Sequence, residues 1–300
     1  MSTLSPTEHV ASSPAAAPAT KADSLWDEAF RRFRRHRLAA LGAVVLFAMV
    51  VAVVVGPAMY RVPINDIDFK AKLRGPSWAH PLGTDDLGRD VLSRVVWGTR
   101  VSMQAGVFAV LLAIAIGVPV GLAAGYYRGA VDQVIMRLTD AWLSFPFLIL
   151  AIGLVTILGP SLTNATVAIG LGATPTYLRL TRGLVLSTKE EDFVQGARAL
   201  GAGDPRLMAR HILPNIWSAL VVQATVSIPG AIIAEAILSF LGLGVQPPTP
   251  SWGTMLNTAQ QFLESAPWMA WWPGLAIFSL ALSFNLAGDG LRDLLDPRDY

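Results

Sequence analysis

The sequence has no cysteine and few charged residues. The absence of cysteine among 300 residues excludes disulfides, thiol nucleophiles and thiolate metal sites. Charged residues make up only 15% of the chain and hydrophobic residues 53%, whereas about a quarter of the residues of a soluble domain are charged. The composition therefore excludes an ordinary soluble domain and predicts a single membrane-embedded unit.

Several chemistries lack their sequence patterns. The four histidines are far apart, and none has the spacing of a metal motif such as His-Glu-x-x-His, so no metal site is expected. A Gly-rich phosphate loop ending in Lys-Ser or Lys-Thr is missing, so we expect ATP hydrolysis in other chains and no enzyme activity in this one. The net charge of +2 comes without a basic patch interleaved with aromatic residues, which argues against a nucleic-acid partner.

Apolar runs dominate what is present. Six stretches come near the roughly 20 apolar residues that a helix needs to cross a bilayer. They are residues 38–60, 101–127, 141–160, 161–178, 216–246 and 265–288. The turn Gly159-Pro160-Ser161 is so short that the third and fourth spans should form a hairpin. The sequence predicts an all-α membrane protein with six spans and both termini on one side.

The N-terminal region sets the expected orientation. Residues 1–30 are rich in Ala, Pro, Ser and Thr and are expected to form a disordered cytoplasmic segment, and residues 31–300 to form the membrane domain. Five arginines between residues 31 and 37 precede the first apolar run. That run is too long for a signal peptide, so we interpret it as a retained span with a cytoplasmic N-terminus.

The loops mostly agree with this orientation. Residues 128–140 and 179–215 carry Arg or Lys and are expected inside, whereas 159–164 and 247–264 carry none and are expected outside. Residues 61–100 disagree, because they hold seven Lys or Arg residues and are nevertheless expected outside. Five aspartates in the same loop offset part of that charge.

Residues 187–215 form the longest polar interruption in the second half of the chain. They predict two short helices, more order than a simple connection needs, and therefore a docking surface. Thr188 and Glu191 have the spacing of a capping box at the start of the first helix. Gly201 and Gly203 can end that helix with positive φ, and Asp204 is expected to cap the second. The alternative is an amphipathic helix that touches only lipid headgroups.

This stretch resembles the "EAA" loop of bacterial ABC importer permeases. Gln195-Gly196-Ala197 stand at the Glu-Ala-Ala positions, Gly201 follows at the family spacing, and Leu213-Pro214 close the motif. The glutamine is a departure, because the family glutamate is thought to anchor the loop through its charge.

Three further segments agree with the resemblance. They are His80 to Val91, Gly125-Tyr126-Tyr127, and the tail from Leu286 to Pro297. Together with the loop, they identify the chain as similar to the C-type permease subunits of dipeptide, oligopeptide and nickel ABC importers, over residues 30–300.

The resemblance implies a type I ABC importer permease fold in the bacterial inner membrane. The implied partners are a second homologous permease, two cytoplasmic ATPase subunits that bind ATP and Mg, and an extracytoplasmic binding protein. No cofactor is expected on this chain itself. Peptides are the implied cargo, and nickel or another small solute is the alternative within the same family. The residues expected to couple to the ATPase are Glu191, Asp192, Phe193, Gln195, Gly196, Ala197, Arg198, Ala199, Leu200 and Gly201. Within them, Phe193, Ala197 and Leu200 are expected on one helix face.

Polar residues inside the apolar runs are candidates for the translocation path. Glu235 is a carboxylate within the fifth predicted span, and such residues are rare and often functional. It could line the path or bond to a neighbouring helix, and both interpretations stay open. Gln223 and Asn285 are weaker candidates, which interhelical hydrogen bonds explain at least as well.

Two other function classes fit the sequence less well than an ATP-driven permease. An ion-gradient transporter would be expected to show repeated broken segments, and no internal repeat is evident. An intramembrane hydrolase would need a nucleophile and a base at membrane depth, and no predicted span holds a His or Lys beside a Ser. For residues 84–90 we favour a structural turn, whose aspartates cap the next helix, over a contact with the binding protein.

Overall fold

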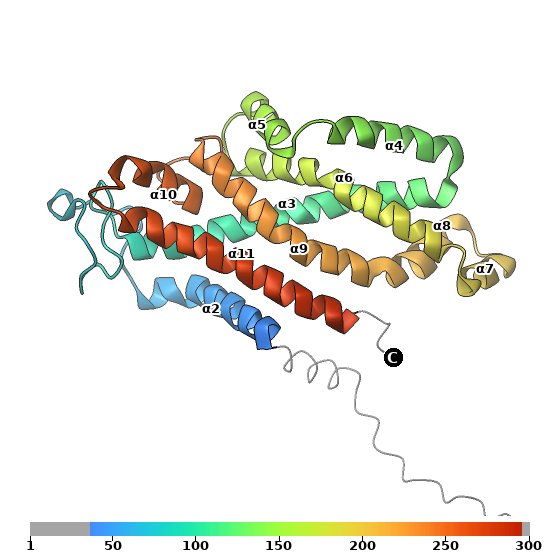
Figure 1. The fold of residues 1–300 in the computed structure, drawn as a ribbon, viewed down its shortest axis with the longest axis horizontal. Coiled ribbons are helices and arrows are strands. Elements are labelled where there is room, and N and C mark those ends of the chain that lie inside the picture. Colours follow the sequence, from blue (N-terminus) through green and yellow to red (C-terminus); the bar gives the residue numbers. More distant parts are fainter. Residues whose placement is uncertain (1–36, 296–300) are drawn as a thin grey trace, which may run out of the picture.

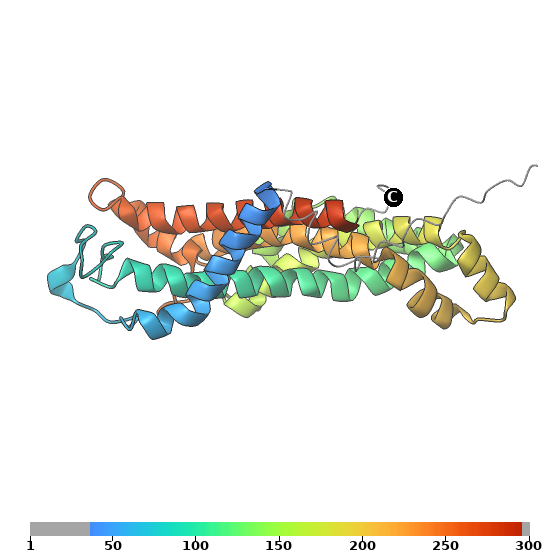
Figure 2. The ribbon, with the colours of Figure 1, turned by 90° about the horizontal axis from the view of Figure 1, so that it is seen from below.

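The computed structural model describes residues 37–295, which are nearly all helical. Five long helices form the bundle. Four of them lie roughly side by side along the long axis of the molecule, and the first in the chain crosses the others at an angle (Figures 1 and 2). The five helices are α2 (Arg37–Met59), α3 (Val91–Tyr127), α6 (Leu162–Thr188), α9 (Leu213–Phe240) and α11 (Trp268–Leu295). The predicted all-α class is confirmed for this part of the chain. The predicted disorder of residues 1–30 and the first four of the five arginines lie outside the described residues.

Short elements occupy the two ends of the bundle. Near one end lie α7 (Asp192–Ala199), α8 (Asp204–Arg206) and the π-helical segment η2 (Leu207–Ile212). The other end holds α10 (Trp252–Ala259) and the loop before α3, with η1 (Phe69–Ala71) (Figures 1 and 2). The basic loop that breaks the charge pattern therefore lies at the opposite end from α7.

Four helical stretches are long and apolar enough to cross a membrane. They are Arg37–Gly56, Val91–Tyr127, Asp204–Phe240 and Trp268–Leu294. A bent pair of helices is a fifth candidate. α6 is 27 residues long, about 40 Å at 1.5 Å per residue, which exceeds the roughly 30 Å of a hydrocarbon core. Its polar residues make α6 less hydrophobic than the four stretches named above. The number of six spans therefore stays a prediction.

The predicted span at 141–160 is not one helix. α4 (Gly129–Leu143) and α5 (Phe147–Leu158) meet there at 87°. Pro146 lies in the break and has no N–H to continue the helical ladder, and its ring disfavours helical backbone at the residue before it. The 128–140 segment, expected to be a loop, is largely the helix α4.

The short turn before α6 does form. Gly159 has φ of +90° and ends α5, and the Ser161 side chain caps α6 by accepting from the backbone N–H of Asn164 at 3.1 Å. α5 packs against α6. The predicted hairpin is present, but α5 supplies only 12 residues to it.

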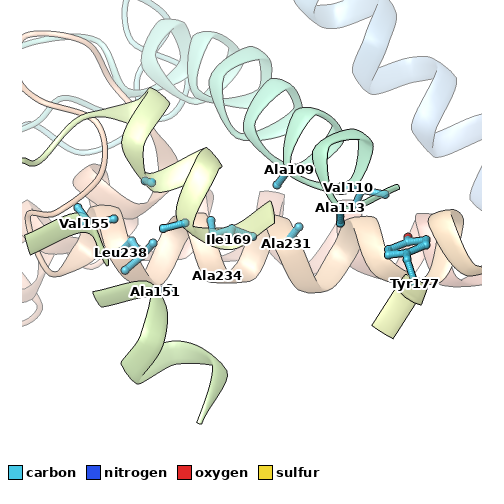
Figure 3. Packing of buried hydrophobic residues seen from close by; sticks show 12 residues of the cluster. Ala109, Val110, Ala113, Ala151, Val155, Ile169, Tyr177, Ala231, Ala234 and Leu238 are labelled. Atoms are coloured by element: carbon cyan, nitrogen blue, oxygen red, sulfur yellow. The ribbon is translucent and has the colours of Figure 1, made fainter. Parts of the chain in front are cut away.

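Small residues allow α3 and α6 to pack closely along much of their length. A Cβ atom at Gly121 would lie 2.6 Å from the carbonyl oxygen of Leu178 on α6. Gly117 and Gly125 lie about one turn away on either side, and a Cβ atom at each would lie 2.8 Å from α6. Figure 3 shows the neighbouring core, where Ala109 of α3 and Ala231 of α9 are among the buried residues packed with α5 and α6. The spacing of small residues is the pattern that lets membrane helices approach each other.

The loop before α3 is held by its aspartates. Asp85 accepts hydrogen bonds from the backbone N–H groups of Leu87 and Arg89, both at 2.9 Å, and from the Arg89 side chain at 2.6 Å. Asp90 is the N-cap of α3 and accepts from the backbone N–H of Ser93. This confirms the interpretation of residues 84–90 as a structural turn that caps the next helix.

Candidate functional site

The start of α7 differs from the predicted capping box. α6 continues through Thr188, so that residue has helical backbone and cannot act as the N-cap. Glu191 is the N-cap, and its side chain makes no capping hydrogen bond. The helix ends as expected at a glycine, because Gly201 has φ of +85°. Gly203 has φ of −72°, so only one of the two predicted glycines uses the left-handed region.

Asp204 does not cap the second helix. Gly203 is the N-cap of α8, and Asp204 is its first residue. The Asp204 carboxylate instead accepts a hydrogen bond of 2.6 Å from the hydroxyl of Tyr126, at the end of α3. The local sequence predicts a cap because Asp is a preferred capping residue. In the structure its carboxylate instead accepts the hydrogen bond from Tyr126, which lies 78 residues earlier in the chain.

α7 is fastened to the long helices by one buried residue and by side-chain hydrogen bonds from Gln195 and Arg198. Val194 is fully buried in a cluster with Leu207 and Ile212 of η2. Gln195 donates its side-chain N–H to the carbonyl of Lys189, just after α6, at 2.9 Å. An ionised glutamate could not make that bond because it has no donor. The glutamine thus anchors the loop by hydrogen bonding, without the family glutamate's charge.

The exposed face of α7 carries two large apolar side chains. Phe193 is 45% exposed and Leu200 is 91% exposed. Ala197 was expected beside them but packs partly against the buried cluster. Glu191, Asp192, Gly196, Arg198 and Ala199 are exposed. An isolated chain that exposes Phe and Leu beside charged groups at the tip of a bundle presents a surface suited to a protein partner.

A polar cluster at the end of α3 was not predicted from the sequence. The Arg198 side chain donates to the Tyr126 hydroxyl at 3.3 Å, and its guanidinium lies 5.8 Å from the centre of the tyrosine ring. Lys189 donates to the backbone carbonyl of Tyr126 at 3.4 Å. Burial, with Arg128 nearby, lowers the pKa of Lys189. Lys189 and Arg198 lie 63 and 72 positions from Tyr126 in the sequence. No local sequence pattern therefore predicts that they meet, and their polarity is the only signal.

Glu235 bridges two long helices. It is fully buried, and its carboxylate accepts from Ser102 of α3 at 2.8 Å and from Ser239 of α9 at 2.6 Å. Gln223 bonds within α9 to Ser227, and Asn285 is exposed on α11. Within residues 37–295, no hydrogen bond joins these three candidates to one another. The geometry thus gives Glu235 the helix-bridging contacts, and the path role of all three residues stays a prediction.

Comparisons with known proteins agree on one family. Residues 117–298 match the model described as "Binding-protein-dependent transport system inner membrane component". Residues 24–76 match the "N-terminal TM domain of oligopeptide transport permease C".

Curated relatives cover nearly the whole chain. The dipeptide transport system permease protein DppC of Alkalihalophilus pseudofirmus is 43% identical over 92% of this chain and 90% of its own length. The glutathione transport system permease protein GsiD of Pectobacterium atrosepticum is 45% identical over 91% of each chain. DppC of Haemophilus influenzae is 45% identical over 94% of this chain and 96% of its own.

A solved structure shares the fold. A chain of the inward-facing MetNI methionine ABC transporter aligns with a TM-score of 0.56 and 20% identity, over 68% of this chain and 97% of that one. The fold is thus that of a type I ABC importer permease. With the family matches and the apolar helices, it follows that the chain belongs to the binding-protein-dependent transport system inner membrane components, as a multi-pass permease of the bacterial inner membrane.

Proposed function

We propose that this permease imports short peptides, powered by ATP hydrolysed in partner subunits. It forms the path with a second, homologous permease, and it couples to two ATPase subunits through residues 187–215. ATP and Mg belong to those ATPases, and an extracytoplasmic binding protein delivers the peptide. The observation that carries the proposal is the exposed apolar face of α7, fastened to the membrane helices from behind.

The attachment of α7 explains how force would pass into the membrane. Val194 ties it to the cluster around η2, which leads directly into α9. Gln195 ties it to the end of α6, and Arg198 to the end of α3. Closure of an ATPase dimer would therefore displace α7 together with three long helices, which suits rigid-body alternating access.

The docking contacts divide into two kinds. Phe193 and Leu200 would enter an apolar cleft of the ATPase, because their side chains are exposed on this chain. Glu191, Asp192 and Arg198 would meet its charges at the rim, where ion pairs steer association more than they add affinity. Gly196, Ala199 and Gly201 would let the partner approach closely.

The peptide assignment rests on the transport systems to which the relatives belong. Two of those quoted are dipeptide permeases and one is a glutathione permease, at 43% and 45% identity. Dipeptides and glutathione share an amide-linked backbone with a free carboxylate, so short peptides are the common chemical class. An ion-gradient transporter is not favoured, because these relatives are named as subunits of transport systems and not as single-chain carriers.

A co-purification experiment tests the coupling. The chain is purified in mild detergent after expression with its partner genes, as wild type, as Leu200→Asp and as Trp78→Asp. Leu200, the C-cap residue of α7, is 91% exposed, and Trp78 is 104% exposed in the loop before α3 at the opposite end of the bundle, so neither change opens a core. We expect wild type and Trp78→Asp to retain the ATPase and Leu200→Asp to lose it.

Two results would contradict the proposal. If wild type purifies without any ATPase and its peptide uptake into vesicles resists vanadate, the importer assignment fails. If Leu200→Asp keeps the ATPase as well as Trp78→Asp does, the ATPase docks elsewhere and the coupling role of α7 fails.

A further inference from the structure

The hydroxyl of Tyr126 lies between the two short helices of the coupling loop. It donates to the carboxylate of Asp204 on α8 at 2.6 Å and accepts from the guanidinium of Arg198 on α7 at 3.3 Å. One hydroxyl thus uses its single proton and one lone pair to join α3 to both helices. Both bonds are charge-assisted, which makes them stronger than bonds between neutral groups.

The tyrosine ring adds a second contact to the same arginine. The guanidinium of Arg198 lies 5.8 Å from the ring centre, within the range of a cation–π interaction. Within residues 37–295, Arg198 has no carboxylate at ion-pair distance, so Tyr126 is its main polar partner. Its hydrogen bond to Tyr126 raises the pKa of Arg198.

The backbone holds Tyr126 itself in place. A Cβ atom on the preceding Gly125 would lie 2.8 Å from Val185 of α6, so the last turn of α3 fits closely against α6. Lys189, the C-cap residue of α6, donates to the carbonyl of Tyr126 at 3.4 Å. The hydroxyl therefore projects from a fixed support toward helices that are short and exposed.

We propose that Tyr126 is the positioning residue of the coupling loop. Its hydroxyl fixes α7 relative to α3, so that a displacement of α7 by the ATPase moves α3 by the same amount. The positioning follows from the contacts of this chain alone, whereas the transmitted displacement rests on the proposed function. Tyr126 acts through Arg198 and Asp204 and does not contact the partner or the cargo.

Spin labels measure this positioning directly, because a cysteine-free chain accepts two labels without background. Cysteines replace the exposed Ala115 on α3 and the exposed Ala199 on α7, in the full chain in lipid nanodiscs. We expect one narrow distance distribution in the wild-type background. Tyr126→Phe, which keeps the ring and loses the hydroxyl, should broaden the distribution and add a second population. An unchanged distribution would overturn the proposal.

Tyr127→Phe is the matched control. Tyr127 is next in sequence and 51% exposed, and it has no hydroxyl hydrogen bond within the described part of the chain. The distribution should stay narrow in this variant, and equal broadening by both tyrosine variants would overturn the proposal. Asp204→Asn keeps an acceptor oxygen and should stay close to wild type, whereas Asp204→Ala should broaden. The aspartate variants also test the same hydrogen bond if Tyr126→Phe fails to fold.

The complex with its ATPases gives the second readout. For this readout the second label is moved from Ala199 to the exposed Ala209 of η2, outside the proposed docking contacts. If the coupling loop and α3 move as one body, the wild-type distance between the labels at Ala115 and Ala209 should be the same without nucleotide and with ATP and vanadate. In Tyr126→Phe it should shift between the two states. A shift in wild type would overturn the proposal. If no ATPase binds the chain, the proposed function fails, but the nucleotide-free comparison still decides the role of Tyr126.

Discussion

Replacing Gly121 by alanine tests whether α3 and α6 depend on contact between their backbones. The new Cβ atom would lie 2.6 Å from the carbonyl oxygen of Leu178 and 2.8 Å from the Cβ of Thr181. Real Cβ atoms do not approach other heavy atoms that closely, so the two helices must separate. Forcing an extra carbon into a packed interface costs about 1–3 kcal/mol.

Gly183 provides a control on the same pair of helices. It lies inside α6, is exposed, and a Cβ atom there would meet nothing within 4 Å. Alanine favours a helix over glycine by about 1 kcal/mol at either position. That gain cancels when the two variants are compared, so Gly121→Ala should be less stable than Gly183→Ala by about 1–3 kcal/mol.

The assay is reversible unfolding by SDS in mixed micelles, followed by tryptophan fluorescence. The chain has nine tryptophans, so the signal reports on the whole bundle. Wild type should lie between the two variants if the clash exceeds the gain in helix propensity. Equal stability of Gly121→Ala and Gly183→Ala would refute the inference that α3 and α6 touch through their backbones.

Three further changes have clear expected outcomes. Gly196→Ala should stabilise α7 by about 1 kcal/mol, because a Cβ atom meets nothing within 4 Å, and hydrogen exchange of α7 should slow. Glu235→Ala should lower the free energy of unfolding in SDS by about 2–5 kcal/mol through an unfilled cavity, and Glu235→Gln by clearly less because it keeps bonds to its serine partners. Equal losses would refute this. Asp132→Asn should cost about 1 kcal/mol and loosen α4 in hydrogen exchange, since it breaks a two-point pair with the half-buried Arg182.

The prolines show why the sequence predicts the positions of the helices better than the positions at which a helix breaks. Pro119, Pro175 and Pro229 all lie inside long helices, whereas Pro146 lies at an 87° bend. Neighbouring helices and local adjustments can satisfy the backbone groups that a proline frees within a membrane protein. Whether that happens depends on which helices lie beside the proline, and the local sequence does not contain that information.

α10 was missed because its surroundings resemble a loop. The predicted outer segment at 247–264 begins with several prolines and carries no Lys or Arg. Ser251 and Thr254 nevertheless form a reciprocal capping box at the start of an eight-residue helix. This signal is local and could have been found from the sequence, although threonine is less usual than glutamate at its third position.

In the short helix α7, hydrophobic periodicity predicts only part of what the structure shows. Gly201 marked the end of α7 because only a positive φ fits there, and that prediction is confirmed. The sequence did not predict which face would be buried, because Phe193 and Val194 are adjacent apolar residues in a helix of eight. Two turns do not define a stripe, so packing against η2 decides that Val194 is buried and Phe193 is exposed.

The basic loop at residues 61–100 illustrates a different limit, that of counting charges. The rule that cytoplasmic loops are rich in Lys and Arg works when those cations face lipid headgroups and water. Here Arg94 is buried 3.6 Å from the carboxylate of Asp85, and Arg89 bonds to the same carboxylate. These two cations belong to a folded turn that starts α3, at the opposite end from α7. The first span usually dominates the orientation of a membrane protein. The arginines at 31–37 are therefore a better guide to the orientation of this chain than Arg89 and Arg94, whose charges are paired with Asp85.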